Sequence, residues 1–151
     1  MKKLNLLFLM LIIAAFALPA FAQKLDTFGY YTIKRPTKDF ADISEIHLSG
    51  DYGAEQKPPV YGLIRLKKKS AKDYRLLKPT VKGRTVSFTT RTVAGVYYKF
   101  TGAFTKLFDD LKNEVQGTPT GGTALQGTLV KYRGKKKIAQ ALVKCTYFGG
   151  D

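Results

Sequence analysis

Histidine and cysteine are side chains that often carry catalytic or metal chemistry, and this chain of 151 residues has one of each, His47 and Cys145. As a general base, His47 would need a hydroxyl or a carboxylate held beside it. Ser44, Ser49 and Asp51 are nearby in the sequence, but no local pattern fixes any of them against the imidazole. We therefore expect His47 to be a strand residue without a catalytic role.

The acidic residues do not indicate a metal site or a hydrolase either. One histidine and one cysteine cannot build a zinc site alone, and the group Asp109, Asp110 and Glu114 lacks the ligand spacing of a calcium loop. A glycosidase pair would have to come from carboxylates that carry no local signature, namely Asp42, Glu45, Asp51 and Glu55. The sequence therefore predicts a protein that is not an enzyme and that has no metal ion or cofactor.

Cys145 lies in a β-branched and aromatic run, residues 143–147, which reads Val-Lys-Cys-Thr-Tyr. Alternation along a strand places its side chain on the same face as Val143 and Tyr147, both of which are core formers. A single cysteine cannot form an intrachain disulfide. We expect a buried thiol and a core that folds without a covalent cross-link.

The first 22 residues have the features of a cleavable signal peptide. Two lysines precede the apolar run 4–16, Pro19 follows it, and Ala20-Phe21-Ala22 places small residues at the −3 and −1 positions of a cleavage site. An uncleaved anchor is the alternative, but the apolar stretch is at the short end of the roughly 17 to 25 residues that span a bilayer. We expect a protein exported to the periplasm or the medium, with one domain, residues 23–151, and no membrane span in the mature chain.

The mature chain alternates polar and apolar residues with a period of two, and glycine, proline and aspartate separate the alternating runs. The Ala94-Gly95 pair and Gly134 each occupy a hairpin turn, where positive φ angles are required. One segment, 104–115, has apolar residues at helical spacing. The predicted strands are 28–34, 44–49, 59–66, 74–82, 86–92, 96–104, 124–132 and 138–148.

Eight short strands joined mostly by hairpins favour an all-β fold, a small antiparallel up-and-down barrel with one short helix; a compact β-sandwich is the alternative. The barrel is preferred because closure removes the edge strands that a strand-rich exported chain would expose. In outline such a barrel resembles those of lipocalins and avidins. Gly29-Tyr30-Tyr31 has tyrosine where the lipocalin Gly-x-Trp motif has tryptophan, and the chain contains no tryptophan.

Basic residues are in excess and they are clustered. The 24 lysines and arginines that follow residue 22 exceed the 11 acidic residues by 13. In an up-and-down barrel every second connection emerges at the same end, so the first connection and the 67–73 and 133–137 turns would form one positive end, opposite the more acidic segments 51–55 and 109–114. The predicted anion-binding surface consists of Lys34, Arg35, Lys67, Lys68, Lys69, Lys72, Arg133, Lys135, Lys136 and Lys137.

Two functions remain open from the sequence. In the first, the barrel holds a small apolar or amphipathic anionic ligand, with its head group at the basic mouth and with an interior lined by Tyr61, Phe88, Tyr98, Phe100 and Tyr147. In the second, the core is solid and the basic end docks on an anionic envelope polymer, a membrane surface or a protein partner. Nucleic acid is a weaker expectation, because the aromatic residues alternate into a core instead of interleaving with exposed lysines.

Overall fold

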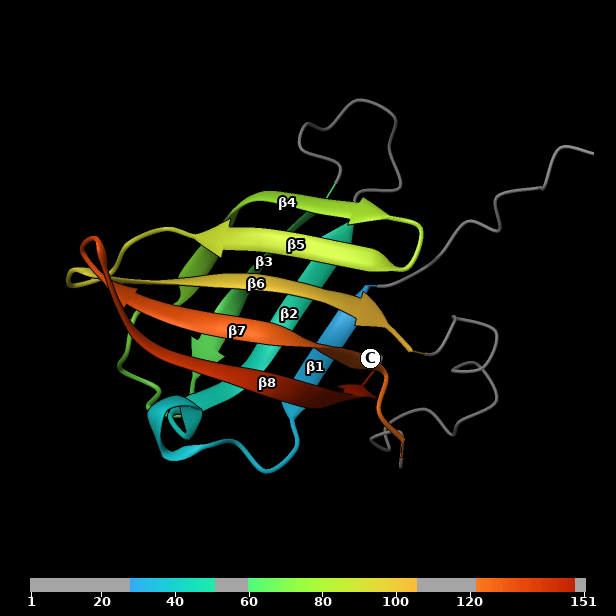
Figure 1. Cartoon of the computed structure of the whole chain (residues 1–151), viewed down its shortest axis with the longest axis horizontal. Coiled ribbons are helices and arrows are strands. Elements are labelled where there is room, and N and C mark those ends of the chain that lie inside the picture. Colours follow the sequence, from blue (N-terminus) through green and yellow to red (C-terminus); the bar gives the residue numbers. More distant parts are fainter. Residues whose placement is uncertain (1–27, 51–59, 106–121, 149–151) are drawn as a thin grey trace, which may run out of the picture.

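The computed structural model of the protein describes residues 28–50, 60–105 and 122–148. These residues form a closed antiparallel barrel in which each strand pairs with the next along the chain and the last pairs with the first (Figure 1). The strands are β1 Gly29–Ile33, β2 Ile43–Gly50, β3 Val60–Leu66, β4 Tyr74–Lys82, β5 Thr85–Thr90, β6 Val96–Phe104, β7 Leu125–Arg133 and β8 Lys136–Phe148, with a one-turn 3-10 helix, η1 Lys38–Phe40, between β1 and β2. The predicted up-and-down barrel is confirmed, and the sandwich alternative is wrong.

Several predictions fall on parts of the chain that the structure does not describe. The signal peptide, the acidic segments 51–55 and 109–114, and all of the predicted helix beyond residue 105 lie outside the described residues. Within the described part of the chain, no helix has the length and the hydropathy needed to cross a membrane.

The alternation of apolar residues produces the core. In β6, Val96, Tyr98 and Phe100 are buried inside the barrel, whereas Lys99 and Thr101, on the alternate positions, are exposed. Other strands contribute the rings that meet these side chains, with centroid distances of 4.9 Å for Tyr74–Tyr98, 5.2 Å for Phe88–Phe100 and 5.5 Å for Tyr31–Tyr147. Each fully buried aromatic side chain contributes about 1.5 to 3 kcal/mol through the hydrophobic effect, so the core can hold the fold without a disulfide.

A pair of glycines makes room for one of these rings. Gly102 in β6 lies opposite Gly127 in β7. A Cβ atom added at Gly102 would lie 2.6 Å from Cζ of Phe100, and one added at Gly127 would lie 2.7 Å from the same atom. Main-chain atoms would lie closer still, with the Gln126 carbonyl oxygen 2.3 Å from the first added Cβ and the Thr101 carbonyl oxygen 2.5 Å from the second, so the close approach of the two strands excludes side chains here together with the Phe100 ring.

The β5–β6 hairpin has a two-residue turn, as the sequence predicts. Val93 and Val96 exchange two main-chain hydrogen bonds of 2.8 and 2.9 Å, and the residues between them have positive φ angles, 46° at Ala94 and 78° at Gly95. Positive φ at both central positions is the geometry of a type I′ turn, which matches the twist of the flanking strands. Glycine adopts this geometry readily, whereas alanine does so with strain from its Cβ atom.

Candidate functional site

Four connections lie at one end of the barrel, because consecutive strands run in opposite directions: β1–β2, β3–β4, β5–β6 and β7–β8 (Figure 1). The β3–β4 turn contacts the first connection through a 2.9 Å hydrogen bond from the Lys67 N–H to the Asp42 carbonyl. The β7–β8 turn contacts the β5–β6 turn through a bond of the same length from the Gly134 N–H to the Gly95 carbonyl. The basic turns therefore share one end, as predicted, although the β3–β4 and β7–β8 turns lie on opposite sides of it.

All ten cations predicted for the anion-binding surface are exposed. The last two, Lys136 and Lys137, are the first residues of β8 and not part of the turn, because Arg133 pairs directly with Lys136 and leaves a two-residue turn. The sequence interpretation omitted Arg91, which is exposed in the β5–β6 connection at the same end. The same alternation of connections that located the other cations would have located it. We call this set of ten residues together with Arg91 the basic end.

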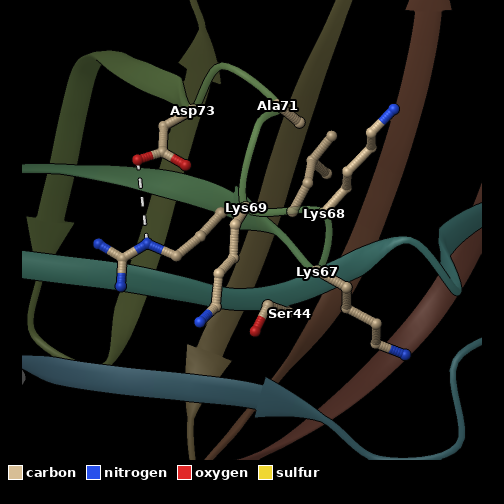
Figure 2. A pocket seen from close by; sticks show the side chains of 8 residues that line it. Ser44, Lys67, Lys68, Lys69, Ala71 and Asp73 are labelled. Atoms are coloured by element: carbon tan, nitrogen blue, oxygen red, sulfur yellow. Dashed lines mark ion pairs between the residues drawn. The ribbon is translucent and has the colours of Figure 1, made fainter.

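A hollow of about 430 Å³ lies beside the β3–β4 turn. Three lysines of the turn, Lys67, Lys68 and Lys69, extend from the main chain in different directions (Figure 2). Arg65 at its edge is bound by two carboxylates, with N–O distances of 2.7 Å to Glu45 and 3.9 Å to Asp73. The arginine charge is thus compensated, and the lysines present a spread positive surface. Residues lining the hollow are Ser44, Arg65, Leu66, Lys67, Lys68, Lys69, Ala71 and Asp73.

The first connection covers the barrel at this end. Phe40 in η1 is 0% exposed, and its ring centroid lies 6.4 Å from that of Tyr98 in the core. Lys131 of β7 holds the same connection, because its Nζ donates to the Asp39 carbonyl at 3.2 Å and lies 3.7 Å from the Asp42 carboxylate. We call residues 34–42 the cap. The cap closes the end that the sequence interpretation treated as an open mouth.

Four of the five residues predicted to line the interior do so. Phe88, Tyr98, Phe100 and Tyr147 are all less than 9% exposed, and their rings contact other core rings. The prediction for Tyr61 is wrong: it is 50% exposed, on the outside of β3. Tyr61 is wrongly assigned to the interior because β3 carries apolar side chains on both faces, and the sequence does not show which face is buried.

Tyr98 has one unusual feature. Its hydroxyl is buried and makes no hydrogen bond in the described part of the protein. Burial, followed by the nearby Asp42 carboxylate and Tyr74, raises the pKa of this hydroxyl far above its ordinary value of 10.0. It is therefore a neutral, unpaired donor directly beneath the cap.

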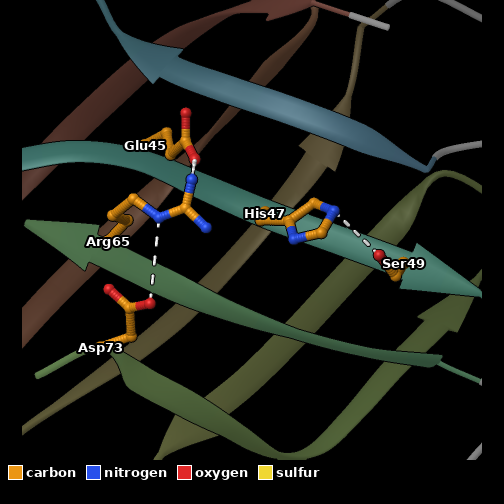
Figure 3. A network of polar contacts seen from close by, with 5 residues as sticks. All are labelled: Glu45, His47, Ser49, Arg65 and Asp73. Atoms are coloured by element: carbon orange, nitrogen blue, oxygen red, sulfur yellow. Dashed lines mark hydrogen bonds and ion pairs between the residues drawn. The ribbon is translucent and has the colours of Figure 1, made fainter. Parts of the chain in front are cut away.

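His47 contacts a hydroxyl but lacks the rest of a catalytic arrangement. Its Nε2 lies 2.9 Å from the Ser49 hydroxyl (Figure 3). Its ring also stacks on that of Tyr30, with the ring centroids 4.4 Å apart. Partial burial is the main influence on the imidazole and lowers its pKa below 6.5, so the ring is neutral at pH 7. The carboxylate on the same strand, Glu45, is bound to Arg65 instead. Ser49 and His47 are two residues apart on one strand face, so alternation alone explains their contact.

Among the described residues, no three histidine, cysteine, aspartate or glutamate side chains gather closely enough to hold a metal ion. The basic end is thus the largest concentration of one kind of chemistry in the described barrel. The chain matches no protein-family model, no curated protein and no solved structure at a significant level.

Proposed function

We propose that the mature chain is an exported, non-enzymatic docking protein whose basic end binds an extended anionic polymer of the cell envelope. One observation carries this proposal: the exposed cations of all four connections at one end of the barrel lie on a single surface, while the barrel beneath them is capped and packed.

The distribution of charge suits an extended partner better than a small anion. The lysines of the β3–β4 turn point in different directions, and the cations of the β7–β8 turn lie on the other side of the end (Figures 1 and 2). A single small anion can contact only one of these groups, whereas a polymer can cross the end and contact several. Exposed charges are screened beyond about 10 Å at 0.1 M salt, so binding of this kind weakens steeply as salt rises.

The acidic residues at this end leave most of the cations uncompensated. Three acidic residues, Asp39, Asp42 and Asp73, lie in the connections at this end, against the eleven cations of the basic end. Asp42 lies beside Lys131, and Asp73 lies beside Arg65, and neither of those two cations belongs to the basic end as defined above. The carboxylates of Asp42 and Asp73 therefore offset charges other than those offered to the polymer, and Asp39 is far outnumbered by the cations of the basic end. The net field above the end is positive and attracts a polyanion before contact.

The test compares three triple charge reversals of equal size for binding to heparin or to another polyanion of known charge density. Two of them alter the basic end, Lys67, Lys68 and Lys69 to Glu, and Lys135, Lys136 and Lys137 to Glu. The matched control alters β4 and the β4–β5 turn near the other end, with Lys78, Lys82 and Arg84 changed to Glu. At about 1 kcal/mol per cation near an anionic surface, each basic-end variant loses at least about 100-fold in affinity, and the control loses much less. Equal losses in all three would overturn the proposal, because they would mean diffuse attraction to net charge.

A second candidate function is supported by the Tyr98 hydroxyl. A small anionic amphiphile that displaced the cap would meet this unpaired donor and Lys131, whose Nζ lies 5.7 Å from the centre of the Tyr98 ring. Titration with a fluorescent fatty acid tests this alternative. Saturable one-to-one uptake that is lost in Lys131→Met supports it, and the absence of saturable uptake rejects it.

A further inference from the structure

Strand β8 extends well beyond the strand that closes the barrel against it. β1 pairs with only the last part of β8, from Cys145 to Phe148. One more main-chain hydrogen bond follows, 2.7 Å from the Lys34 N–H to the Lys144 carbonyl. The next residue, Arg35, has a φ of 48°, and this left-handed conformation turns the chain away from the sheet. In the described part of the chain, residues 136–143 of β8 therefore have a strand partner, β7, on one side only.

The direction of the exposed main-chain groups follows from the alternation of an antiparallel strand. Lys144 directs its carbonyl toward β1, where Lys34 binds it. Residues two and four positions earlier, Leu142 and Gln140, direct their N–H and C=O groups to the same side. Among the described residues, no main-chain group bonds to them there. We call Gln140–Val143 the open edge of β8.

Side chains around the open edge have a distinct chemistry. Leu142 is 71% exposed, the largest exposure among the large apolar residues of the described barrel. It lines a hollow of about 610 Å³ together with three cations, Lys34, Arg35 and Lys144. Free main-chain donors and acceptors, an apolar side chain and positive charges thus lie together where β1 ends.

We propose that the open edge binds an extended acidic peptide segment of a partner protein, which adds to the barrel as a strand beside β8. Such strand addition uses main-chain hydrogen bonds for affinity and flanking side chains for selectivity. Acidic side chains of the segment pair with Arg35 and Lys144, and an apolar one packs on Leu142. This inference goes beyond the docking of a polyanion, because charge alone does not use the N–H and C=O groups of β8.

Charge distinguishes this partner from a second copy of the chain. Pairing of two open edges would bring Lys144 and Arg35 of both copies together, and like charges at an interface oppose association. The start of β8 also limits self-pairing, because Lys136 and Lys137 are exposed there and the register shifts next to them, between Lys131 and Tyr132 of β7. Terminal lysines and bulges are common means of preventing edge-to-edge aggregation. They also confine the edge available to a partner to about four residues.

The first arm of the test needs no variant. Amide hydrogen exchange of the whole mature protein is followed by NMR, with and without an acetylated and amidated Glu-Val-Glu-Val-Glu peptide. In the free protein the amides of Gln140 and Leu142 exchange fast, whereas those of Ala141 and Val143, which face β7, exchange slowly. Saturation with the peptide slows the first pair more than about tenfold and leaves the second pair unchanged. Unchanged exchange at Gln140 and Leu142 in the presence of bound peptide overturns the proposal.

The second arm separates strand addition from electrostatic attraction. Two further peptides of the same sequence have alternate amides N-methylated, one along each edge of the extended peptide. Both keep the charge, but the peptide methylated on the edge that faces β8 cannot form the main-chain hydrogen bonds. We expect that peptide to bind more than about tenfold more weakly than the unmodified one. The double variant Arg35→Glu, Lys144→Glu weakens binding of the unmodified peptide, and the control Lys82→Glu, Arg84→Glu does so much less. Equal binding by methylated and unmodified peptides would show charge attraction alone. Methylation of the peptide leaves the protein unchanged, and the docking function is decided separately by heparin binding of the triple charge reversals, so either proposal can fail while the other holds.

Discussion

Phe40 is the side chain through which the cap closes the barrel, and its truncation tests that role. The residue is 0% exposed and lies against the Tyr98 ring. Local structure gives the cap little support, because η1 is a single turn and Thr37 makes no side-chain capping hydrogen bond. The Lys131–Asp42 pair is partly exposed, and such pairs contribute at most about 1 kcal/mol. Burial of Phe40 is therefore the main interaction that holds the cap in place.

The substitution Phe40→Ala is expected to lower the free energy of unfolding by about 3 to 5 kcal/mol, as for other fully buried phenylalanines. For a domain of this size the loss lowers Tm by roughly 10 to 20 °C. Urea unfolding followed by tyrosine fluorescence and circular dichroism measures the loss, since the protein has no tryptophan. Lys38→Ala, at an exposed site in the same turn, is the control and changes stability by less than about 0.5 kcal/mol. A loss below about 1 kcal/mol in Phe40→Ala would refute the packed cap and favour an open mouth.

Three further predictions concern a turn, a histidine and a thiol. Ala94→Asn raises stability by about 1 kcal/mol, because asparagine tolerates the φ of 46° better than alanine does; a lower urea midpoint would contradict this. The lowered pKa of His47 means that the unfolded chain binds more protons than the folded one as pH falls through 6.5, so stability declines below that pH and levels off below the folded pKa. Urea midpoints between pH 5.5 and 8 show this decline in the wild type and a smaller one in His47→Gln; identical profiles would exclude it. Burial raises the pKa of Cys145 to about 12 from 9.0, which lowers the thiolate fraction at pH 8 by about a thousandfold. A thiol reagent should therefore react slowly with the native protein and fast with the denatured protein. Equal reaction rates in the two states would place the thiol outside the core.

The barrel could be predicted from sequence because most of its strands alternate cleanly. In β6 and in the second half of β8, every second residue is apolar, and the structure buries those residues, Cys145 included. Tight turns at Ala94-Gly95 and Gly134 fixed the order of the strands, and the strand count then placed the basic connections at one end. Short-range patterns of this kind carry most of the information about an up-and-down barrel, since neighbours in space are neighbours in sequence.

Features that depend on contacts across the barrel could not be predicted. β3 has apolar residues on both faces, Tyr61 and Leu63 outside and Val60 and Ile64 inside, so its alternation does not say which set is buried. Phe40 is a single apolar residue in a polar connection, and one residue has no periodicity to reveal that it packs into the core. The open edge of β8 arises from the left-handed conformation of Arg35, a residue type that rarely adopts it.

The glycine pair of β6 and β7 is determined by the main chain and not by one neighbouring side chain. A Cβ atom at Gly102 would lie 2.3 Å from the Gln126 carbonyl oxygen, and one at Gly127 would lie 2.5 Å from the Thr101 carbonyl oxygen, so a smaller residue at position 100 does not make room for either. Relatives of this chain should therefore keep two glycines in direct register on neighbouring strands, even where the aromatic residue at position 100 has changed. This signature can reveal distant homologues even where overall sequence identity has been lost.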